Sequence, residues 1–301
     1  MIAAQIKPVS LRSKLCNGKK FSSSSRPQRH ATLAARCESV TETPSFLRRA
    51  AVAVGACALA VQLSAVQPAF AEDSVEPVYF GNGCFWGRQY DFVQAEQDLG
   101  RQVGDISAVV GYAGGAVPVK NPANNKVCYY YTPEKETVYE PLGHAEVVQV
   151  ELRGSDKQSE FRRMADTYFS QFRRLPNGKM LRQDPQDAGP GYRNVIGIPG
   201  GVNSDLYKIL QDANVNNMEL KEGNGGKFTP DGKATEPDVL NVVWVVDSSK
   251  LPFYQAEQYH QYHNGLGHKF PEQYTKEMKQ AAIEAGRVKQ TGCPEFFFLG
   301  S

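Results

Sequence analysis

Residues 76–87, EPVYFGNGCFWG, join a short apolar run to a segment with helical periodicity. The apolar run predicts a strand over 78–81, and the periodicity of the next residues predicts a helix over 85–99. Cys84 then stands at the first turn of that helix, where the glycines before it let the backbone turn tightly and leave the sulfur uncovered. The stretch therefore predicts a strand–turn–helix unit with an accessible thiol at its turn.

Further along the chain, strands alternate with helices, but long irregular stretches separate them. Alternating apolar and polar residues predict a strand over 144–152, and an apolar face predicts a helix over 157–174. The other predicted strands are 106–110, 195–198 and 239–246, and the other predicted helices are 205–218 and 271–285. Loops are predicted at 116–142, 176–191 and 222–237. This pattern predicts an α+β fold, a two-layer α/β sandwich with a mixed, mainly antiparallel sheet.

The uneven charge of the chain indicates a leader segment. Residues 1–71 hold ten of the 34 Lys and Arg but only two of the 32 Asp and Glu, so the rest of the chain is mildly acidic. Residues 1–37 lack acids and are rich in Ser and Arg, which is typical of a transit peptide. An Arg pair at 48–49 then precedes an Ala-rich stretch that ends in AFA at 69–71, the pattern of a cleavage site. We expect 1–71 to be a bipartite targeting peptide that is removed, and 72–301 to form a single domain with a C-terminal tail.

The order of the two signals predicts where the protein goes. A transit-like segment followed by a twin-arginine signal resembles the peptides that lead into the thylakoid lumen of chloroplasts, which is the expected location. The apolar stretch 50–66 is short and interrupted by Gln62, which argues against a permanent membrane span in the mature form. An uncleaved signal anchor is the alternative. The acidic body argues against a nucleic-acid partner.

Cysteine usage agrees with a leader followed by one domain. Three cysteines lie within 1–71, and Cys84, Cys128 and Cys293 lie beyond it. An odd number leaves at least one thiol without a partner in the mature chain. So few cysteines do not form a disulfide scaffold.

Cys84 has the setting of a nucleophile. The thiolate is the attacking form of cysteine, and the unpaired N–H groups and dipole of a helix N-terminus favour negative charge there. Phe85 and Trp86 follow directly and can form an aromatic wall for a methyl or thioether group. For Cys-Phe-Trp alone, a buried structural cysteine is the alternative interpretation.

Two further segments offer acids and a phenol to such a thiol. In GHAE, His144 and Glu146 are expected on the same face of the predicted strand. A carboxyl group half-buried among aromatic rings has a raised pKa and can serve as a proton donor. Asp187 and Tyr192 in DAGPGYR add a carboxylate and a phenol on one loop, although each residue alone is more often structural. Together with Cys84 these residues predict an acid-assisted thiol site.

The motifs GCFWG, GYAGG, GHAEVV, DAGPGYR and PFYQAEQYHQY, spread over residues 78–262, resemble those of the type A peptide methionine sulfoxide reductases. The resemblance implies a ferredoxin-like core and the reduction of methionine-S-sulfoxide, free or in oxidised proteins, as a repair reaction. It also implies that no metal or organic cofactor is needed. An external thiol reductant, thioredoxin or a similar protein, is the expected partner that closes the cycle.

Residue roles follow from the same resemblance. Cys84 is expected to attack the sulfoxide sulfur while Glu146 protonates the oxygen, which leaves Cys84 as a sulfenic acid. Tyr192 is expected to donate a hydrogen bond to the oxygen, and Asp187 to hydrogen-bond within the same cluster. The expected substrate-binding residues are Phe85, Trp86 and His144.

Two departures from the family pattern leave alternatives open. Asn124 stands where the family has a tyrosine, so either its amide or an inserted tyrosine would have to supply a second donor. The candidate tyrosines are Tyr129, Tyr130, Tyr131 and Tyr139. Cys293 is the expected resolving cysteine, and Cys128 is the less favoured candidate.

Two other functions are alternatives to sulfoxide reduction. A thiol peroxidase could use Cys84 against hydroperoxides, but a peroxide pocket needs no aromatic wall. A degenerate family member could bind oxidised methionine without turnover, but the presence of Cys84, Glu146, Asp187 and Tyr192 argues against this.

Overall fold

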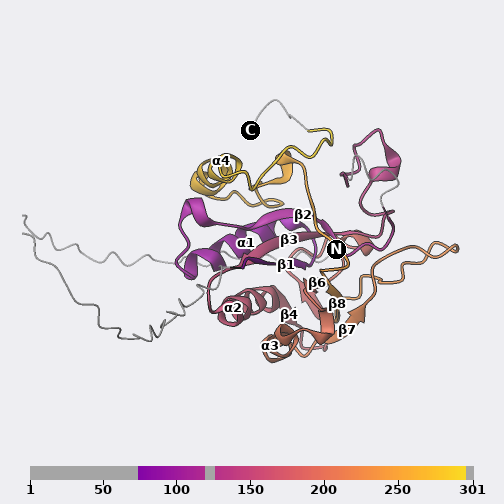
Figure 1. The fold of residues 1–301 in the computed structure, drawn as a ribbon. Coiled ribbons are helices and arrows are strands. Elements are labelled where there is room, and N and C mark those ends of the chain that lie inside the picture. Colours follow the sequence, from indigo (N-terminus) through magenta and orange to yellow (C-terminus); the bar gives the residue numbers. More distant parts are fainter. Residues whose placement is uncertain (1–73, 119–125, 296–301) are drawn as a thin grey trace, which may run out of the picture. The chain divides into compact units, whose positions relative to one another are not determined.

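A seven-stranded sheet organises the residues that the computed structural model describes, 74–118 and 126–295 (Figure 1). In spatial order its strands are β7 (Glu219–Gly223), β8 (Val242–Asp247), β6 (Val195–Ile198), β1 (Glu76–Gly81), β3 (Ala145–Leu152), β2 (Val109–Ala113) and β9 (Tyr254–Gln255). A separate hairpin pairs β4 (Phe172–Arg174) with β5 (Met180–Arg182). The predicted leader and Asn124 lie outside the described residues.

The sheet is mixed and mainly antiparallel, which confirms the prediction. β1 is antiparallel to β3 and β6, and β2 is antiparallel to β3 and β9, whereas β8 is parallel to β6 and β7. The inner strands follow the order β6-β1-β3-β2, with helix α1 (Phe85–Asp98) after β1 and helix α2 (Lys157–Ser170) after β3. This is the βαββαβ arrangement of a ferredoxin-like core.

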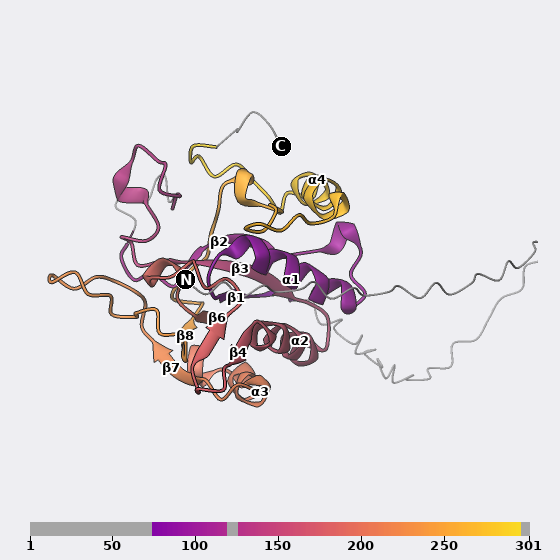
Figure 2. The same cartoon turned by 180° about the vertical axis from the view of Figure 1, so that it is seen from behind.

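The helices α1 and α2 pack side by side against the sheet, and α3 (Asp205–Ala213) follows beside α2 (Figures 1 and 2). Phe80 of β1 lies at the centre of this layer: its ring centroid is 4.9 Å from that of Phe92 on α1 and 6.1 Å from that of Phe161 on α2. All three side chains are buried. Since burial of one such side chain contributes about 1.5–3 kcal/mol, these contacts fix α1, and with it Cys84, against the sheet.

Strand β2 (Val109–Ala113) extends past the predicted end of the strand, because Gly111 lies within the strand and does not end it. The sequence predicts a strand over 106–110 that stops at the glycine-rich GYAGG, but the observed strand includes Gly111. Gly111 pairs with Gln255 of β9. A Cβ atom on Gly111 would lie 2.3 Å from the carbonyl oxygen of Tyr254. The glycine therefore permits the close approach of β9, and it does not end the strand.

Other predicted boundaries shift where pairing decides the backbone. The helix predicted over 157–174 ends at Ser170, because β4 follows and pairs with β5. Strands β5 and β7 lie in or at the start of stretches predicted as loops. The helix predicted over 271–285 is a π-helix, Gln273–Met278, followed by α4 (Lys279–Glu284). None of the helices in residues 74–118 and 126–295 is both long enough and apolar enough to cross a membrane.

Candidate active site

Cys84 is the N-cap residue of α1, at the turn between β1 and that helix. Gly83 has φ +87°, a conformation that favours glycine, and its N–H donates a hydrogen bond of 3.0 Å to the carbonyl oxygen of Tyr192. A Cβ atom on Gly81 would lie 2.5 Å from the carbonyl oxygen of Glu146, so glycine lets β1 approach β3 at this point. The two glycines thus bring three separate segments together at Cys84.

The ionisation state expected for Cys84 is wrong. The side chain is only 7% exposed. Burial raises the pKa of the Cys84 thiol far above its usual range, and the nearby Glu146 raises it further, while a hydrogen bond from the Trp86 N–H lowers it. The helix N-terminus therefore acts as predicted, but loss of hydration outweighs it. The resting side chain is a covered, neutral thiol.

Glu146 has the properties of a neutral acid beside that thiol. It extends from β3, and its Oε2 accepts a hydrogen bond of 3.0 Å from the Phe85 N–H in the first turn of α1. The residue is 2% exposed. Burial raises the pKa of Glu146 well above its usual range, which the Phe85 hydrogen bond only partly opposes. At neutral pH the carboxyl group therefore holds a proton that it can give away.

Asp187 and Tyr192 lie on the loop that follows β5, and this loop reaches the same place. Burial and the nearby Asp184 raise the pKa of Asp187, whereas a hydrogen bond from the Cys84 thiol to its carboxylate lowers it. Burial and, next, the proximity of the Glu146 carboxyl group raise the pKa of Tyr192 above its usual range, so its phenol remains a hydrogen-bond donor. The predicted grouping of Cys84, Glu146, Asp187 and Tyr192 is what the structure contains.

The inserted tyrosines also line this site. Tyr130 and Tyr139 join their hydroxyl groups at 2.9 Å, and the Tyr139 ring stacks on Tyr112 with centroids 4.7 Å apart. Tyr131 is 60% exposed. Tyr129 is the one of the four candidates whose pKa is raised, after burial, by Glu146, Tyr192 and Cys84. Its phenol therefore lies close enough to Glu146, Tyr192 and Cys84 to interact with all three.

Two histidines, His260 and His263, support the aromatic wall, and neither was among the residues predicted for the site. The Trp86 Nε1–H donates to Nδ1 of His260 at 3.1 Å, and the indole stacks on His263 with centroids 3.9 Å apart. The Phe85 ring centroid lies 5.2 Å from that of His260. Burial lowers the pKa of His260 to about 3, so its ring is neutral. The closely spaced histidines of residues 257–263, EQYHQYH, are the sequence feature that could have predicted this role.

His144 is not part of this cluster, so the contacts do not favour its expected role in substrate binding. Its Nδ1 accepts a hydrogen bond of 3.0 Å from the Gly115 N–H, and its ring meets Tyr254 edge-on with centroids 5.2 Å apart. Burial lowers the pKa of His144 to about 3. A neutral, buried imidazole whose contacts are with Gly115 and Tyr254 fits a structural role for His144, which immediately precedes β3.

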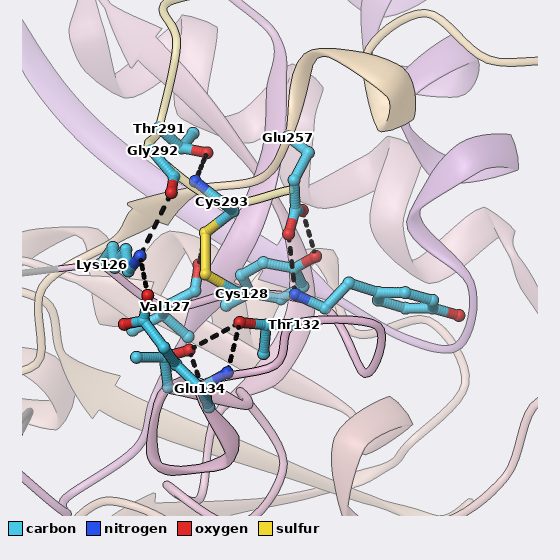
Figure 3. Close-up of a disulfide and its surroundings, with 12 residues drawn as sticks. Lys126, Val127, Cys128, Thr132, Glu134, Glu257, Thr291, Gly292 and Cys293 are labelled. Carbon is cyan, nitrogen blue, oxygen red and sulfur yellow. Dashed lines mark hydrogen bonds and ion pairs between the residues drawn. A yellow bond between two sulfur atoms is a disulfide. The ribbon is translucent and has the colours of Figure 1, made fainter. Parts of the chain in front are cut away.

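The other two cysteines beyond the predicted leader form a disulfide (Figure 3). Cys128 and Cys293 are bonded across 165 residues with Cα atoms 5.6 Å apart, and Cys84 remains a free thiol. Cys293 was predicted to bond to an oxidised Cys84. In this structure its partner is Cys128, and the resolving role of Cys293 stays a prediction. Figure 3 shows Glu257 beside the disulfide; its Oε1 accepts a hydrogen bond of 2.8 Å from the Tyr129 N–H. The disulfide thus adjoins the segment that carries Tyr129.

Known proteins resemble this chain over the segment that builds the site. The model of the family "Peptide methionine sulfoxide reductase" matches residues 76–205. A peptide methionine sulfoxide reductase MsrA of Pseudomonas putida (strain W619) is 33% identical over 192 residues, 64% of this chain and 68% of that protein. The MsrA of Methanoculleus marisnigri is 31% identical over 192 residues, 63% of this chain and 89% of its own length. A solved structure, methionine sulfoxide reductase A of Corynebacterium diphtheriae, is 19% identical with a TM-score of 0.37, covering 64% of this chain and 74% of its own.

Proposed function

Because this chain belongs to the peptide methionine sulfoxide reductase family, we propose that Cys84 is the nucleophile that reduces methionine-S-sulfoxide to methionine. The enzyme acts in repair of oxidised methionine, either free or in proteins. One observation carries the residue assignment: Glu146 accepts from the Phe85 N–H, one residue after Cys84, and is buried as a neutral acid. A nucleophile at the N-terminus of α1 and a proton donor on β3 therefore meet at the first turn of α1.

Glu146 activates the substrate. A sulfoxide sulfur is a poor electrophile until its oxygen is protonated or strongly hydrogen-bonded. The buried Glu146 carboxyl gives its proton to that oxygen, while the phenols of Tyr192 and Tyr129 donate hydrogen bonds to it. Donors held in a water-poor site are worth more than the same donors in water. Tyr129 takes the place of the second phenol that Asn124 does not supply.

Asp187 activates the thiol. Since the resting thiol is neutral, its proton has to leave as the sulfur attacks, and the Asp187 carboxylate already accepts a hydrogen bond from it. The substrate oxygen then passes to Cys84: the substrate sulfur gains two electrons, the Cys84 sulfur loses two, and methionine departs from a Cys84 sulfenic acid. The proton on Asp187 returns to Glu146 before the next cycle.

The wall of Phe85 and Trp86 holds the S-methyl group of the substrate. His260 and His263 keep the Trp86 ring in place, so the methyl group has one site and the oxygen has another. The S- and R-epimers of methionine sulfoxide differ in that the S-methyl group and the oxygen occupy interchanged positions on the sulfur. We expect turnover of the S-epimer and none of the R-epimer, measured by methionine release with dithiothreitol in excess. Equal rates for both epimers, or faster reduction of hydrogen peroxide than of the S-epimer, would overturn this assignment.

The Cys128–Cys293 pair passes electrons to Cys84. One of its thiols condenses with the Cys84 sulfenic acid, which releases water and forms a mixed disulfide. The second thiol attacks the first, which restores the Cys84 thiol and leaves the Cys128–Cys293 disulfide found in the structure. A thioredoxin-like dithiol protein then reduces that disulfide.

Peptide mapping after one equivalent of sulfoxide tests this route. When the fully reduced enzyme has reacted with one equivalent of sulfoxide, we expect a Cys128–Cys293 disulfide and a free Cys84 thiol. In Cys293→Ser, we expect a Cys84–Cys128 disulfide or a persistent sulfenic acid at Cys84. If oxidation stops at Cys84 while Cys128 and Cys293 keep free thiols in the wild type, the route is wrong.

The leader supports a proposal about location. The acid-free, Ser- and Arg-rich residues 1–37 and the Arg pair at 48–49 resemble a chloroplast transit peptide followed by a lumenal signal. On this proposal 1–71 is removed and the enzyme repairs proteins in the thylakoid lumen. N-terminal sequencing of the protein from its source tests it, and a start well before Glu72 would count against the lumen.

A further inference from the structure

Two acids from the connector between β7 and β8 reach the loop that carries Asp187 and Tyr192. Both views show this connector as a long extension beyond the sheet (Figures 1 and 2). At its end nearest β8, Asp238 pairs with Arg182 at 3.0 Å, and Glu236 pairs with Arg193 at 3.1 Å. All four side chains are at most 7% exposed. Both acids lie beyond residues 76–205, which the family model matches.

Arg182 holds the loop by its backbone. Its Nη1 donates to the carbonyl oxygen of Tyr192 at 2.8 Å, and its Nη2 donates to the carbonyl oxygen of Asp187. Asp238 accepts from both nitrogens, at 3.1 and 3.0 Å, and its Oδ2 also accepts from the Gly189 N–H at 3.0 Å. The carboxylate therefore orients the guanidinium group and contacts the loop itself.

The same arrangement extends to the turn before Cys84. The carbonyl oxygen of Tyr192 accepts a hydrogen bond from Nη1 of Arg182 and another, of 3.0 Å, from the Gly83 N–H. A Cβ atom on Gly83 would lie 3.2 Å from Nε of Arg182, so the arginine packs directly against this turn. A shift of Arg182 would therefore move the Asp187 loop relative to Cys84.

Arg193 and Glu236 brace the other side of the loop. Arg193 donates to the carbonyl oxygens of Pro190 at 3.0 Å and Gly114 at 2.8 Å. Glu236 accepts from Arg193 through Oε2 and from the Gly225 N–H through Oε1 at 2.8 Å. The loop thus has one arginine at each end, and each arginine has its own acid.

We propose that Asp238, acting through Arg182, is a positioning residue that sets Asp187 and Tyr192 against Cys84, with Glu236 and Arg193 in a supporting role. Buried ion pairs add little net stability because both charges lose their hydration, so stability alone does not account for two of them at one loop. Catalysis depends on placement, and an error of about 1 Å can cost about a hundredfold in rate. The inference rests on the proposed roles of Asp187 and Tyr192.

Substitution of Asp238 tests it in the full chain. In Asp238→Asn, kcat for methionine-S-sulfoxide should fall about 10- to 100-fold while KM changes by less than about threefold, since the aromatic wall is untouched. Asp238→Glu keeps the charge and should recover part of kcat. Asp231→Asn is the matched control: Asp231 lies on the same connector, 58% exposed and paired with Lys233, and this variant should match the wild type.

Activity is expressed per folded molecule, measured by near-ultraviolet circular dichroism. A wild-type kcat in folded Asp238→Asn overturns the inference. A loss of total activity that only follows the loss of folded protein, with no recovery of kcat in Asp238→Glu, also overturns it. If Asp238→Asn does not fold, Asp238→Glu and Glu236→Gln decide: lowered kcat at unchanged KM in either supports positioning, and wild-type kcat in both opposes it. Failure of the wild type to reduce the S-epimer would be a failure of the proposed function instead.

Discussion

Replacement of Cys84 by serine abolishes reduction of methionine-S-sulfoxide. A serine hydroxyl is neither soft nor acidic enough to attack the sulfoxide sulfur, and it cannot accept the oxygen as a sulfenic acid. The Asp187 carboxylate still has a donor to accept from, so the site should remain folded. We expect no methionine above the uncatalysed background, measured chromatographically with dithiothreitol in excess.

The double variant Cys128→Ser/Cys293→Ser is the matched control. It lacks the thiols of Cys128 and Cys293, but it keeps Cys84, Glu146 and Asp187, so it should release one methionine per enzyme in the first turnover. Methionine formation by Cys84→Ser at a rate near that of the wild type would assign the chemistry to another group.

Substitution of Glu146 by glutamine has the second largest expected effect. The amide oxygen can still accept from the Phe85 N–H, but the side chain has no acidic proton to give to the sulfoxide oxygen. Because general acid catalysis contributes about 10²- to 10⁴-fold, kcat should fall by that factor while the fold is kept. A decrease of less than about threefold would remove Glu146 from its role as acid.

The pH dependence of the two proteins separates this role from a structural one. Burial raises the pKa of Glu146, so wild-type activity should be present below that pKa and decline as pH rises through it. Glu146→Gln should lack this alkaline decline. Stability follows the same sign: the wild type should be most stable, relative to Glu146→Gln, below the pKa of the unfolded carboxyl, and lose that advantage as pH rises through the folded value. Urea unfolding at several pH values measures it.

The amino-acid sequence predicted an α+β fold with a mixed, mainly antiparallel sheet, and its resemblance to the family implied the ferredoxin-like core and the residues of the site. Local periodicity found β1, α1, β3 and α2, because their apolar faces are continuous in sequence. The motifs around Cys84 and Glu146 predicted that they meet, and the first turn of α1 joins them through the Phe85 N–H.

The rest depends on contacts between distant residues. The sequence favours a thiolate at Cys84, but its burial raises the pKa, and burial is a property of the whole fold. Strand β7, ELKEG, has no apolar pattern and exists because β8 pairs with it. Likewise the pairing of Asp238 with Arg182 spans 56 residues and leaves no local signal.

The proposed mechanism is tested by the mass of Cys84 after one turnover. Cys128→Ser/Cys293→Ser is mixed with methionine-S-sulfoxide without any reductant, and its peptides are analysed after dimedone labelling. We expect one methionine per enzyme and a dimedone adduct, the mark of a sulfenic acid, on Cys84. Formation of methionine with Cys84 unmodified would contradict the mechanism.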